Sequence, residues 1–472
     1  MTSIIKVDNL QNQCGANIIS ESSNVITIGA SGDTVTLAAG ASQSGFGRSG
    51  SVNWDTTPKT TGFTAVSGNG YFCDTTSAAF TVTLPAGPSA GDIVAIADYN
   101  GTALTNNITV GRNSSNINGS ATNLIINTNY SAITLVYVDA TSGWRSVDSS
   151  NPNDIITPQY IAATGGTIVT CGDFKIHTFT GPGTFTVTNA GNSSGANSVN
   201  YLVVAGGGAS SASTTTPGGL SIYSSGGGGA GGYRTNFPSP VTTGLPVTAT
   251  AYPITVGGGG TGGPLSSPYE GTSGINSVFS TITSTGGGFG GRGNGSPFPA
   301  PNGAGGPGGS GGGGGASSIC SPGGTGNTPP VSPPQGNTGG AGSSGGPTGG
   351  GGGGGASSIG GNGPVITPPA SPPGTGGAGG NGTANLISGS SVTYAGGGGG
   401  AGGYFVNPGT GGAGGPGGGG TGGASGGPGP DQGVAGAANT GGGAGGTQNY
   451  PCSSRGGNAG GSGIVVIRYK FQ

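Results

Sequence analysis

The chain carries very little charge. It has 11 Lys and Arg and 13 Asp and Glu among 472 residues, which is 5%, whereas about a quarter is usual for a globular protein. The formal net charge of −2 provides no basic field that would attract nucleic acid. No run of cations is present that could hold an anionic membrane. We therefore expect no nucleic-acid partner.

Long apolar runs are also missing. No stretch approaches the roughly 18 to 20 apolar residues of a membrane span, so we expect no membrane insertion. The opening residues 1–8 lack the apolar segment of a secretory signal. The sequence thus predicts synthesis in a cytoplasm, although its small hydroxyl and amide side chains are typical of an extracellular surface.

Catalytic residue patterns are scarce. His177 is the only histidine, and it lies in an alternating apolar and polar run that is typical of a strand. A glycosidase needs two carboxylates at one site, whereas Glu21, Glu270 and the aspartates are scattered along the chain. We expect no enzyme activity, no catalytic residues and no cofactor.

The five cysteines are widely spaced and form no CxxC pair. We interpret them as isolated structural thiols, and a disulfide between Cys320 and Cys452 is the alternative. Because the chain has a single histidine, we do not expect a metal site built from Cys and His.

Glycine is abundant, and it is concentrated in the second half of the chain. Residues 201–472 hold 96 of the 119 glycines and almost no charge. Such a segment cannot build an ordinary side-chain core, so it either stays disordered, since glycine loses much chain entropy on folding, or orders its backbone by other means. The charged residues between Gly206 and Gly461 are Arg234, Glu270, Arg292, Asp431 and Arg455.

Within this segment, glycine recurs at every third residue over residues 303–315 and again over 411–429. A period of three is that of polyproline II, which has no internal hydrogen bonds. Glycine at every third position would let neighbouring backbones approach and exchange N–H···O=C bonds. The sequence therefore predicts that extended glycine-rich stretches, which we call legs, are ordered side by side. Disorder is the alternative.

A longer repeat supports the same interpretation. Residues 311–319 recur as residues 351–359, and the proline-rich residues 328–334 recur closely as 367–373. Repeats of this kind indicate stacked structural units. We expect legs that run back and forth, joined by turns that contain proline, asparagine and aromatic residues.

Alternating β-branched and apolar residues predict strands in three parts of the chain. A short β pattern occupies residues 24–37. We interpret Trp54 and Trp144 as packing residues of a compact middle unit. Its predicted strands are residues 79–85, 92–98, 107–110, 124–127 and 132–138. The later predicted strands are residues 174–180, 183–188, 200–205, 252–256, 277–283 and 463–470.

The predicted fold is all-β, with an N-terminal β segment and a β-domain, then a small β-sheet core that carries a long glycine-rich, polyproline II-like region. The terminal strand is expected to close the small sheet. The predicted domains are residues 1–50, a sandwich-like spacer at 51–150, a linker at 151–164 and a distal glycine-rich domain at 165–472. In the distal domain, the β core is expected at about 165–205, 250–284 and 463–470, and the legs and turns at 206–249 and 285–462.

A few large side chains interrupt the glycine-rich region where turns between the legs are expected. Exposed aromatic rings rimmed by small polar groups suit carbohydrate stacking or protein contact, and rigid legs would pre-organise such a surface. The alternative is that several of these rings pack between the legs as a small core. The candidate receptor-binding residues are Tyr223, Tyr233, Arg234, Phe237, Tyr269, Phe289, Phe298, Tyr404, Phe405 and Tyr450.

Several motifs are distinctive, above all residues 175–185, 201–208, 228–234 and 460–469. With the opening residues 4–8 and stretches of the middle unit, they resemble the glycine-rich tail fibre and adhesin proteins of tailed phages, especially those of marine bacteria and cyanobacteria. Some phage adhesins of this kind order their glycine-rich motifs as polyproline II layers with binding loops at the tips.

The resemblance implies a homotrimeric fibre whose residues 1–50 attach to a virion tail or baseplate protein and intertwine as a stem. It implies that the distal domain binds a host cell-surface glycan or outer-membrane protein through many weak contacts. A virion assembled in the host cytoplasm and released by lysis would also explain an extracellular composition without a secretory signal. The alternatives are a purely structural virion or filament-forming protein and, less directly, an ice-binding or matrix protein.

Overall fold

A computed structural model describes the chain as two compact units, residues 1–155 and 156–472. No helix occurs in its described residues, and so none there could span a membrane; the predicted all-β class is confirmed. The backbone alone is described for residues 9–11, 17–22 and 25–28. Side chains are also described for residues 52–149, 158–213, 224–237, 244–293, 303–317, 321–344, 349–364, 374–403, 408–425, 432–448 and 455–472.

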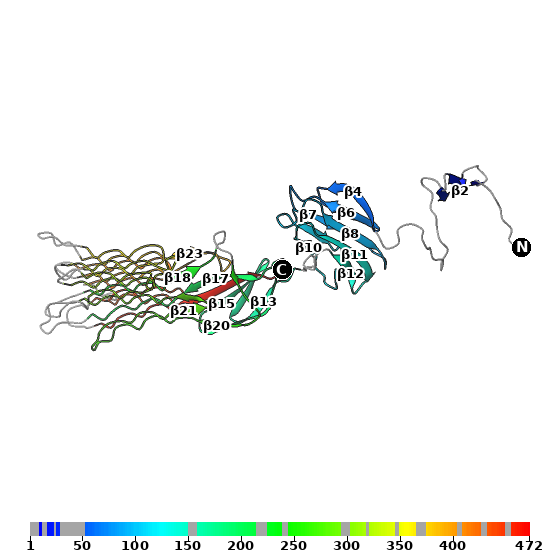
Figure 1. Ribbon diagram of the computed structural model, residues 1–472. Helices are drawn as coiled ribbons and strands as arrows, with labels where there is room; N and C mark the ends of the chain where they lie inside the picture. The colour runs from blue at the N-terminus through cyan, green and yellow to red at the C-terminus, as the bar shows by residue number, and fades with distance from the viewer. Residues whose placement is uncertain are drawn as a thin grey trace, which may run out of the picture. The chain divides into compact units, whose positions relative to one another are not determined.

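A small antiparallel sheet lies near the N-terminus (Figure 1). Its strands, in spatial order, are β1 (Asn9–Gln11), β2 (Asn17–Ser22) and β3 (Val25–Ile28). The β pattern predicted over residues 24–37 includes β3, and the rest of that pattern lies outside the described residues.

Two facing sheets form the rest of the first unit (Figure 1). One has the order β10-β9-β7-β5 and the other the order β12-β11-β8-β6-β4. The five strands predicted here are confirmed as β7 to β11. The bounds are β4 (Asn53–Lys59), β5 (Phe63–Thr64), β6 (Asn69–Cys73), β7 (Phe80–Thr83), β8 (Ile93–Asp98), β9 (Ile108–Gly111), β10 (Leu124–Ile126), β11 (Ala132–Asp139) and β12 (Gly143–Ser149).

The chain winds between these two sheets. From β4 to β9 successive strands alternate between the sheets, so that β4, β6 and β8 are parallel neighbours, as are β5, β7 and β9. Their inward side chains share one core, in which Trp144 is fully buried. Trp54 is half-buried and stacks on Phe72 with 4.8 Å between the ring centroids. Both tryptophans therefore act as packing residues, as interpreted from the sequence.

The second unit contains two larger sheets and a hairpin. Their spatial orders are β13-β16-β20-β21-β22, β14-β15-β25-β17-β18 with β19 also paired to β17, and β23-β24. The bounds are β13 (Ile161–Thr164), β14 (Thr167–Cys171), β15 (Phe174–Phe179), β16 (Gly183–Ala190), β17 (Ser198–Val204), β18 (Tyr233–Thr235), β19 (Leu245–Pro246), β20 (Ala251–Thr255), β21 (Ser277–Phe279), β22 (Ile282–Ser284), β23 (Thr383–Asn385), β24 (Val392–Tyr394) and β25 (Ile464–Lys470).

The C-terminal strand β25 lies in the middle of its sheet. It is inserted between β15 and β17 and is antiparallel to both. Val465 and Ile467 face one core cluster, while Ile464 and Val466 face another. A strand buried on both faces has a continuous apolar run rather than an alternating pattern. The predicted closure of the sheet by the terminal strand is confirmed.

The structure differs from the sequence prediction at several places in this unit. Residues 161–164 were predicted as linker, but they form β13 and pair with β16 in the sheet. The strands β18 and β19 and the hairpin β23-β24 lie within the regions predicted as legs and turns. These elements are only two to four residues long, so their patterns are too short to predict a strand.

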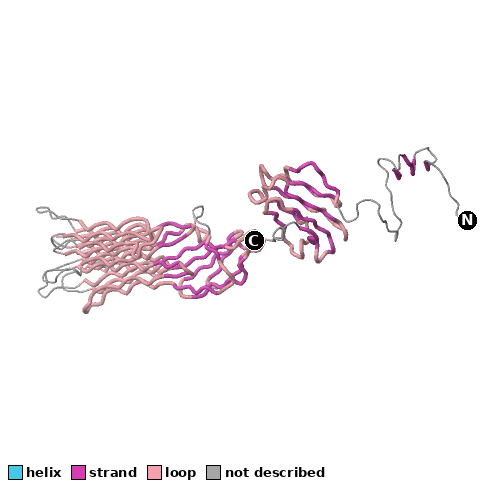
Figure 2. The backbone as a smooth tube through the Cα atoms, viewed as in Figure 1, coloured by secondary structure: helices cyan, strands magenta, loops and turns pink. Residues whose placement is uncertain are grey.

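The strands continue directly into the glycine legs (Figure 2). For example, β17 runs into the leg after residue 204, and a leg that ends at residue 463 runs into β25. The legs are therefore rooted in the sheets and lead away from them. We call legs the described stretches 205–213, 224–232, 257–263, 269–276, 285–293, 303–317, 321–327, 335–344, 349–364, 374–382, 395–403, 408–425, 432–448 and 455–463.

Hydrogen bonds join each leg to several others. In the leg 224–232, successive amides donate in turn to three neighbouring legs, so that every third amide meets the same neighbour. This is the pattern expected of parallel and antiparallel polyproline II chains, which have three residues per turn. The legs form an ordered, polyproline II-like bundle. From Gly226 to Gly231 the acceptor carbonyls are those of Gly291, Gly351, Ala444, Gly288, Gly354 and Gly441.

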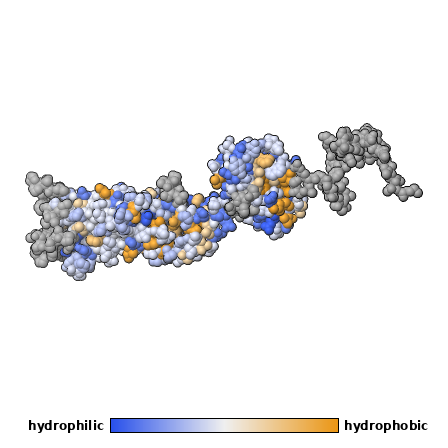
Figure 3. Space-filling model, viewed as in Figure 1, coloured by the Kyte–Doolittle hydropathy of each residue, from blue (hydrophilic) through white to orange (hydrophobic). Residues whose placement is uncertain are grey.

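Glycine is required because the legs are packed backbone against backbone. A Cβ atom at Gly228 would overlap the carbonyl oxygen of Gly208, and one at Gly313 would overlap that of Gly351. Ala230 lies where its leg faces a side-chain core that includes Leu202 and Val204. In the view of Figure 3, the leg region shows mostly residues of intermediate hydropathy.

Candidate functional site

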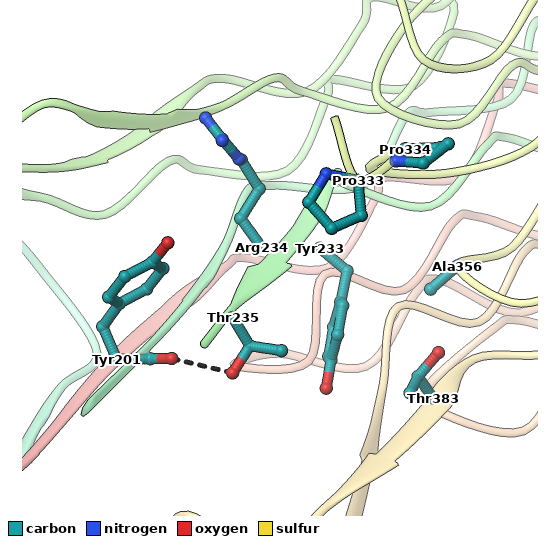
Figure 4. A pocket seen from close by; sticks show the side chains of 8 residues that line it. All are labelled: Tyr201, Tyr233, Arg234, Thr235, Pro333, Pro334, Ala356 and Thr383. Atoms are coloured by element: carbon teal, nitrogen blue, oxygen red, sulfur yellow. Dashed lines mark hydrogen bonds between the residues drawn. The ribbon is translucent and has the colours of Figure 1, made fainter. Parts of the chain in front are cut away.

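A pocket of about 210 Å³ lies where the sheet of the second unit meets the legs (Figure 4). It includes two of the residues predicted to bind a receptor, Tyr233 and Arg234. One wall is β18, the last strand of its sheet. The lining residues are Tyr201, Tyr233, Arg234, Thr235, Pro333, Pro334, Ala356 and Thr383.

Strand pairing places the side chains of β17 and β18 in the pocket. Val203 is opposite Arg234 in the antiparallel register. Because side chains alternate along a strand, Tyr201 and Arg234 lie on one face of the sheet, and Tyr233 and Thr235 lie on the other. The pocket therefore extends around the edge of β18.

The proline wall is held by two polar side chains. The Asn327 side-chain oxygen accepts hydrogen bonds from the amides of Val331 and Gln335, at 3.2 Å each. The buried Gln335 side chain accepts a bond of 2.9 Å from the amide of Thr285. The backbone carbonyl of Gln335 accepts another hydrogen bond, of 2.8 Å, from the amide of Tyr233. The segment with Pro333 and Pro334 is thus fixed against β18.

The two tyrosines are also fixed. Asn385 Nδ2 donates a hydrogen bond of 2.8 Å to the Tyr233 hydroxyl. The Tyr201 ring packs edge-on against the Phe279 ring, with 6.4 Å between the ring centroids. Burial raises the pKa of Tyr233 and of Tyr201 above the ordinary value of 10.0, so both phenols are neutral at physiological pH and available as hydrogen-bond donors.

Arg234 supplies the charge of the pocket. Its Nη1 donates a hydrogen bond of 3.3 Å to the Thr283 carbonyl, in an exposed position. No carboxylate of the described residues forms an ion pair with Arg234. The positive charge nearby opposes the rise in the pKa of Tyr201. An arginine without an acidic partner beside neutral phenols favours a negatively charged ligand group.

Another candidate residue, Tyr269, meets a charged side chain elsewhere on the legs. The Arg292 guanidinium lies 4.3 Å from the centre of the Tyr269 ring, a cation–π distance. Burial lowers the pKa of Arg292, and the neighbouring Tyr269 and Glu270 oppose that shift. The carbonyl of Tyr269 accepts a hydrogen bond of 2.9 Å from the amide of Ala212. Ala212 and Arg292 are next to the last residues of the legs 205–213 and 285–293, so the pair lies at the ends of these two legs.

The structure places the other candidate residues differently. Tyr233 and Arg234 were expected at a turn, but they form β18 because they pair in register with β17. Phe237 packs against the core cluster of Leu202 and lies 5.1 Å from the Arg468 guanidinium. Phe289 is half-buried, with its ring against Gly306. The candidates that lie outside the described residues are Tyr223, Phe298, Tyr404, Phe405 and Tyr450.

Sequence reasoning missed most of the pocket lining. Tyr201 lies in a predicted core strand, and nothing local marks its ring as accessible. The proline-rich repeat at residues 328–334 was a usable signal, since paired prolines mark a rigid surface segment. Among the described residues, no cluster of three or more His, Cys, Asp or Glu is placed to hold a metal ion.

Comparison with known families finds a match over more than half of the chain. The family described as a glycine-rich domain matches residues 178–470. This span begins in β15, ends in β25 and includes both the pocket and the legs. A search of curated proteins found no match.

Proposed function

We propose that this chain, which belongs to the glycine-rich domain family, is a phage tail fibre adhesin that binds a host cell-surface glycan or outer-membrane protein without catalysis. The observation that carries the proposal is the bundle itself. The strands of the second unit anchor the legs at one end, and side chains such as Tyr269 and Arg292 stand on the bundle where the legs end.

Rigidity supports a role in binding. The amides of the legs are paired with carbonyls of other legs, so side chains on the bundle are held in place before a ligand arrives. Less conformational entropy is then lost on binding. Several copies on one particle would multiply weak contacts into strong adhesion.

A homotrimer is part of the proposal, and the edge strand β14 supports self-association. All five of its residues are exposed, with Ile168 and Val169 at 45% and 54% of their full surface. Protein edges are commonly protected by charge or proline, and β14 has neither. A trimeric mass of the full chain in solution is expected, and a monomeric mass would count against this part.

The remaining parts of the proposal concern the virion. Residues 1–50 would attach the fibre to a tail or baseplate protein, and the particle would be assembled in the host cytoplasm and released by lysis. The extracellular type of composition supports this location. Co-purification of the full chain with intact virions, detected by peptide mass spectrometry, tests it.

Binding of the labelled full chain to a panel of bacterial and cyanobacterial cells tests the proposed function. We expect saturable binding to some strains and not to others. The variant with Tyr404, Phe405 and Tyr450 changed to Ser is expected to bind less, whereas Tyr99→Ser, at an exposed position of the first unit, is not. If no strain binds a folded, oligomeric chain, a purely structural virion or filament-forming protein becomes the better account.

A further inference from the structure

We propose that the pocket beside β18 is a binding site for a single pyranose ring that carries one negative charge, such as a uronic acid unit of a surface polysaccharide. This inference rests on the proposed function, because it names a ligand class for the same domain. The inferred site lies at the end of the bundle where the legs join the sheet, and it is separate from the Tyr269 and Arg292 pair at the other ends of the legs.

The size of the pocket limits the ligand. Its volume of about 210 Å³ is below the roughly 300 Å³ at which pockets for drug-sized ligands begin. One sugar ring fits such a space, and a longer oligosaccharide would have to extend into solvent. A chain polysaccharide could therefore place one residue in the pocket and leave its neighbours outside.

The surfaces of the pocket suit a pyranose. Tyr233, Pro333 and Pro334 provide an aromatic ring and flat apolar rings, and Tyr201 provides a second aromatic ring on the face of the sheet that carries Arg234 (Figure 4). Sugar C–H groups stack on such faces, while hydroxyl groups at the rim exchange hydrogen bonds with the sugar. The phenol groups and the Thr383 hydroxyl are of this kind.

The charge of the pocket selects an anion. Arg234 is the one cation among the lining residues, and no described carboxylate neutralises it. A guanidinium binds a carboxylate or a sulfate ester through two parallel hydrogen bonds. A single arginine matches a single negative charge, so uronic acids and sugar sulfates share the required chemistry.

The walls need little rearrangement on binding. Gln335 and Asn327 hold the proline segment, and Asn385 holds the Tyr233 hydroxyl. These bonds link the pocket to three separate parts of the chain. A pocket that is already formed loses less free energy to ordering when the ligand enters.

Calorimetric titration and saturation-transfer NMR of the full chain with monosaccharides test the inference. The probes are methyl glucuronide, methyl galacturonide, glucose 6-sulfate and neutral methyl glucoside. We expect at least one of the anionic sugars to bind with a Kd in the millimolar range, as is usual for one small ring, and at least tenfold more tightly than methyl glucoside. A preference between carboxylate and sulfate then identifies the source of the charge.

Two variants make the test specific. Arg234→Gln is expected to weaken anionic sugar binding at least tenfold, and Ala356→Leu to abolish it by filling the pocket. Arg145→Gln, at an exposed position of the first unit, is the control and should not change binding. Equal binding of neutral and anionic sugars, or unchanged binding by a folded Arg234→Gln chain, would overturn the inference.

The two proposals can fail separately. Suppose that the variants Arg234→Gln and Ala356→Leu bind every sugar as the parent chain does, while the chain still binds cells strain-selectively. The pocket inference then fails and the adhesin proposal stands. If the anionic sugar binds as expected but no cell is bound, the pocket stands and the adhesin proposal fails.

Discussion

The amide of Gly228 donates a hydrogen bond of 2.8 Å to the carbonyl of Ala444, and the carbonyl of Gly228 accepts one of 2.9 Å from the amide of Gly398. One residue without a side chain thus joins three legs that lie far apart in the sequence. A Cβ atom at this position would overlap the carbonyl oxygen of Gly208. The space that other proteins fill with side chains is filled here by backbone.

We predict that Gly228→Ala destabilises the distal domain by about 2 kcal/mol or more, since inserting atoms into a packed interior typically costs about 1 to 3 kcal/mol. Urea titration followed by NMR signals from β25 amides measures the change. Gly181→Ala is the control, because a Cβ atom there would meet nothing within 4 Å. Equal stability of the two variants would contradict close backbone packing at Gly228.

The buried histidine predicts a pH dependence. His177 Nδ1 lies 2.7 Å from the Gly165 carbonyl oxygen and Nε2 lies 3.0 Å from the Tyr469 hydroxyl. Burial is the main reason that its pKa is below the ordinary 6.5. The unfolded chain therefore takes up a proton at a higher pH than the folded chain, and the free energy of unfolding falls as the pH falls below about 6.5.

The expected slope between pH 6.5 and 5.5 is at most about 1.4 kcal/mol per pH unit, the limit for one proton. Urea titrations at pH 5.5, 6.5 and 7.5, read from β25 amides, measure it. Because the chain has one histidine and carboxyl groups titrate mainly below this range, His177→Gln should remove most of the slope. A slope that persists in that variant would assign the effect to other groups.

The two described cysteines should differ in reactivity. Cys73 is fully buried, and that burial, with the nearby charge of Asp98, raises its pKa to about 12. Cys171 is exposed at the end of β14. Since the thiolate is the reactive form, we expect iodoacetamide at pH 8 to modify Cys171 and to leave Cys73 intact until the chain is denatured.

Peptide mass spectrometry of native and denatured samples distinguishes these sites. Modification of Cys73 in denaturant is the internal control for its accessibility. Equal rates at both thiols in the native chain would show that the core around Cys73 opens readily. The interpretation of Cys14, Cys320 and Cys452 as isolated thiols remains a prediction, because their side chains lie outside the described residues.

Much of the β framework could be predicted because it depends on local alternation. The runs around β7, β11 and β16 have the period of two that half-buried strands require, and β25 begins with an uninterrupted apolar run that needs cover on both faces. The polyproline II-like bundle could be predicted from the glycine period of three. Which leg lies beside which could not, because glycines carry no side chains that distinguish one neighbour from another.

The candidate site was predicted only in part, for a related reason. Tyr233 and Arg234 stand out as large side chains in a glycine-rich segment, but their strand forms only through pairing with Val204 and Val203. Pro333 lies at the pocket because the nearby Gln335 side chain is hydrogen-bonded to Thr285, which is far away in the sequence. Long-range placement of this kind leaves no local pattern in the sequence.

Amide hydrogen exchange of the legs, measured by NMR on the full chain, tests the central claim most directly. The amides of Gly227, Gly313 and Gly351 donate hydrogen bonds of 2.8 to 3.0 Å to carbonyls of other legs. The bundle predicts that they exchange orders of magnitude more slowly than free peptide amides, as slowly as the amides of β25. Exchange at the rate of an unstructured glycine-rich peptide would contradict the bundle.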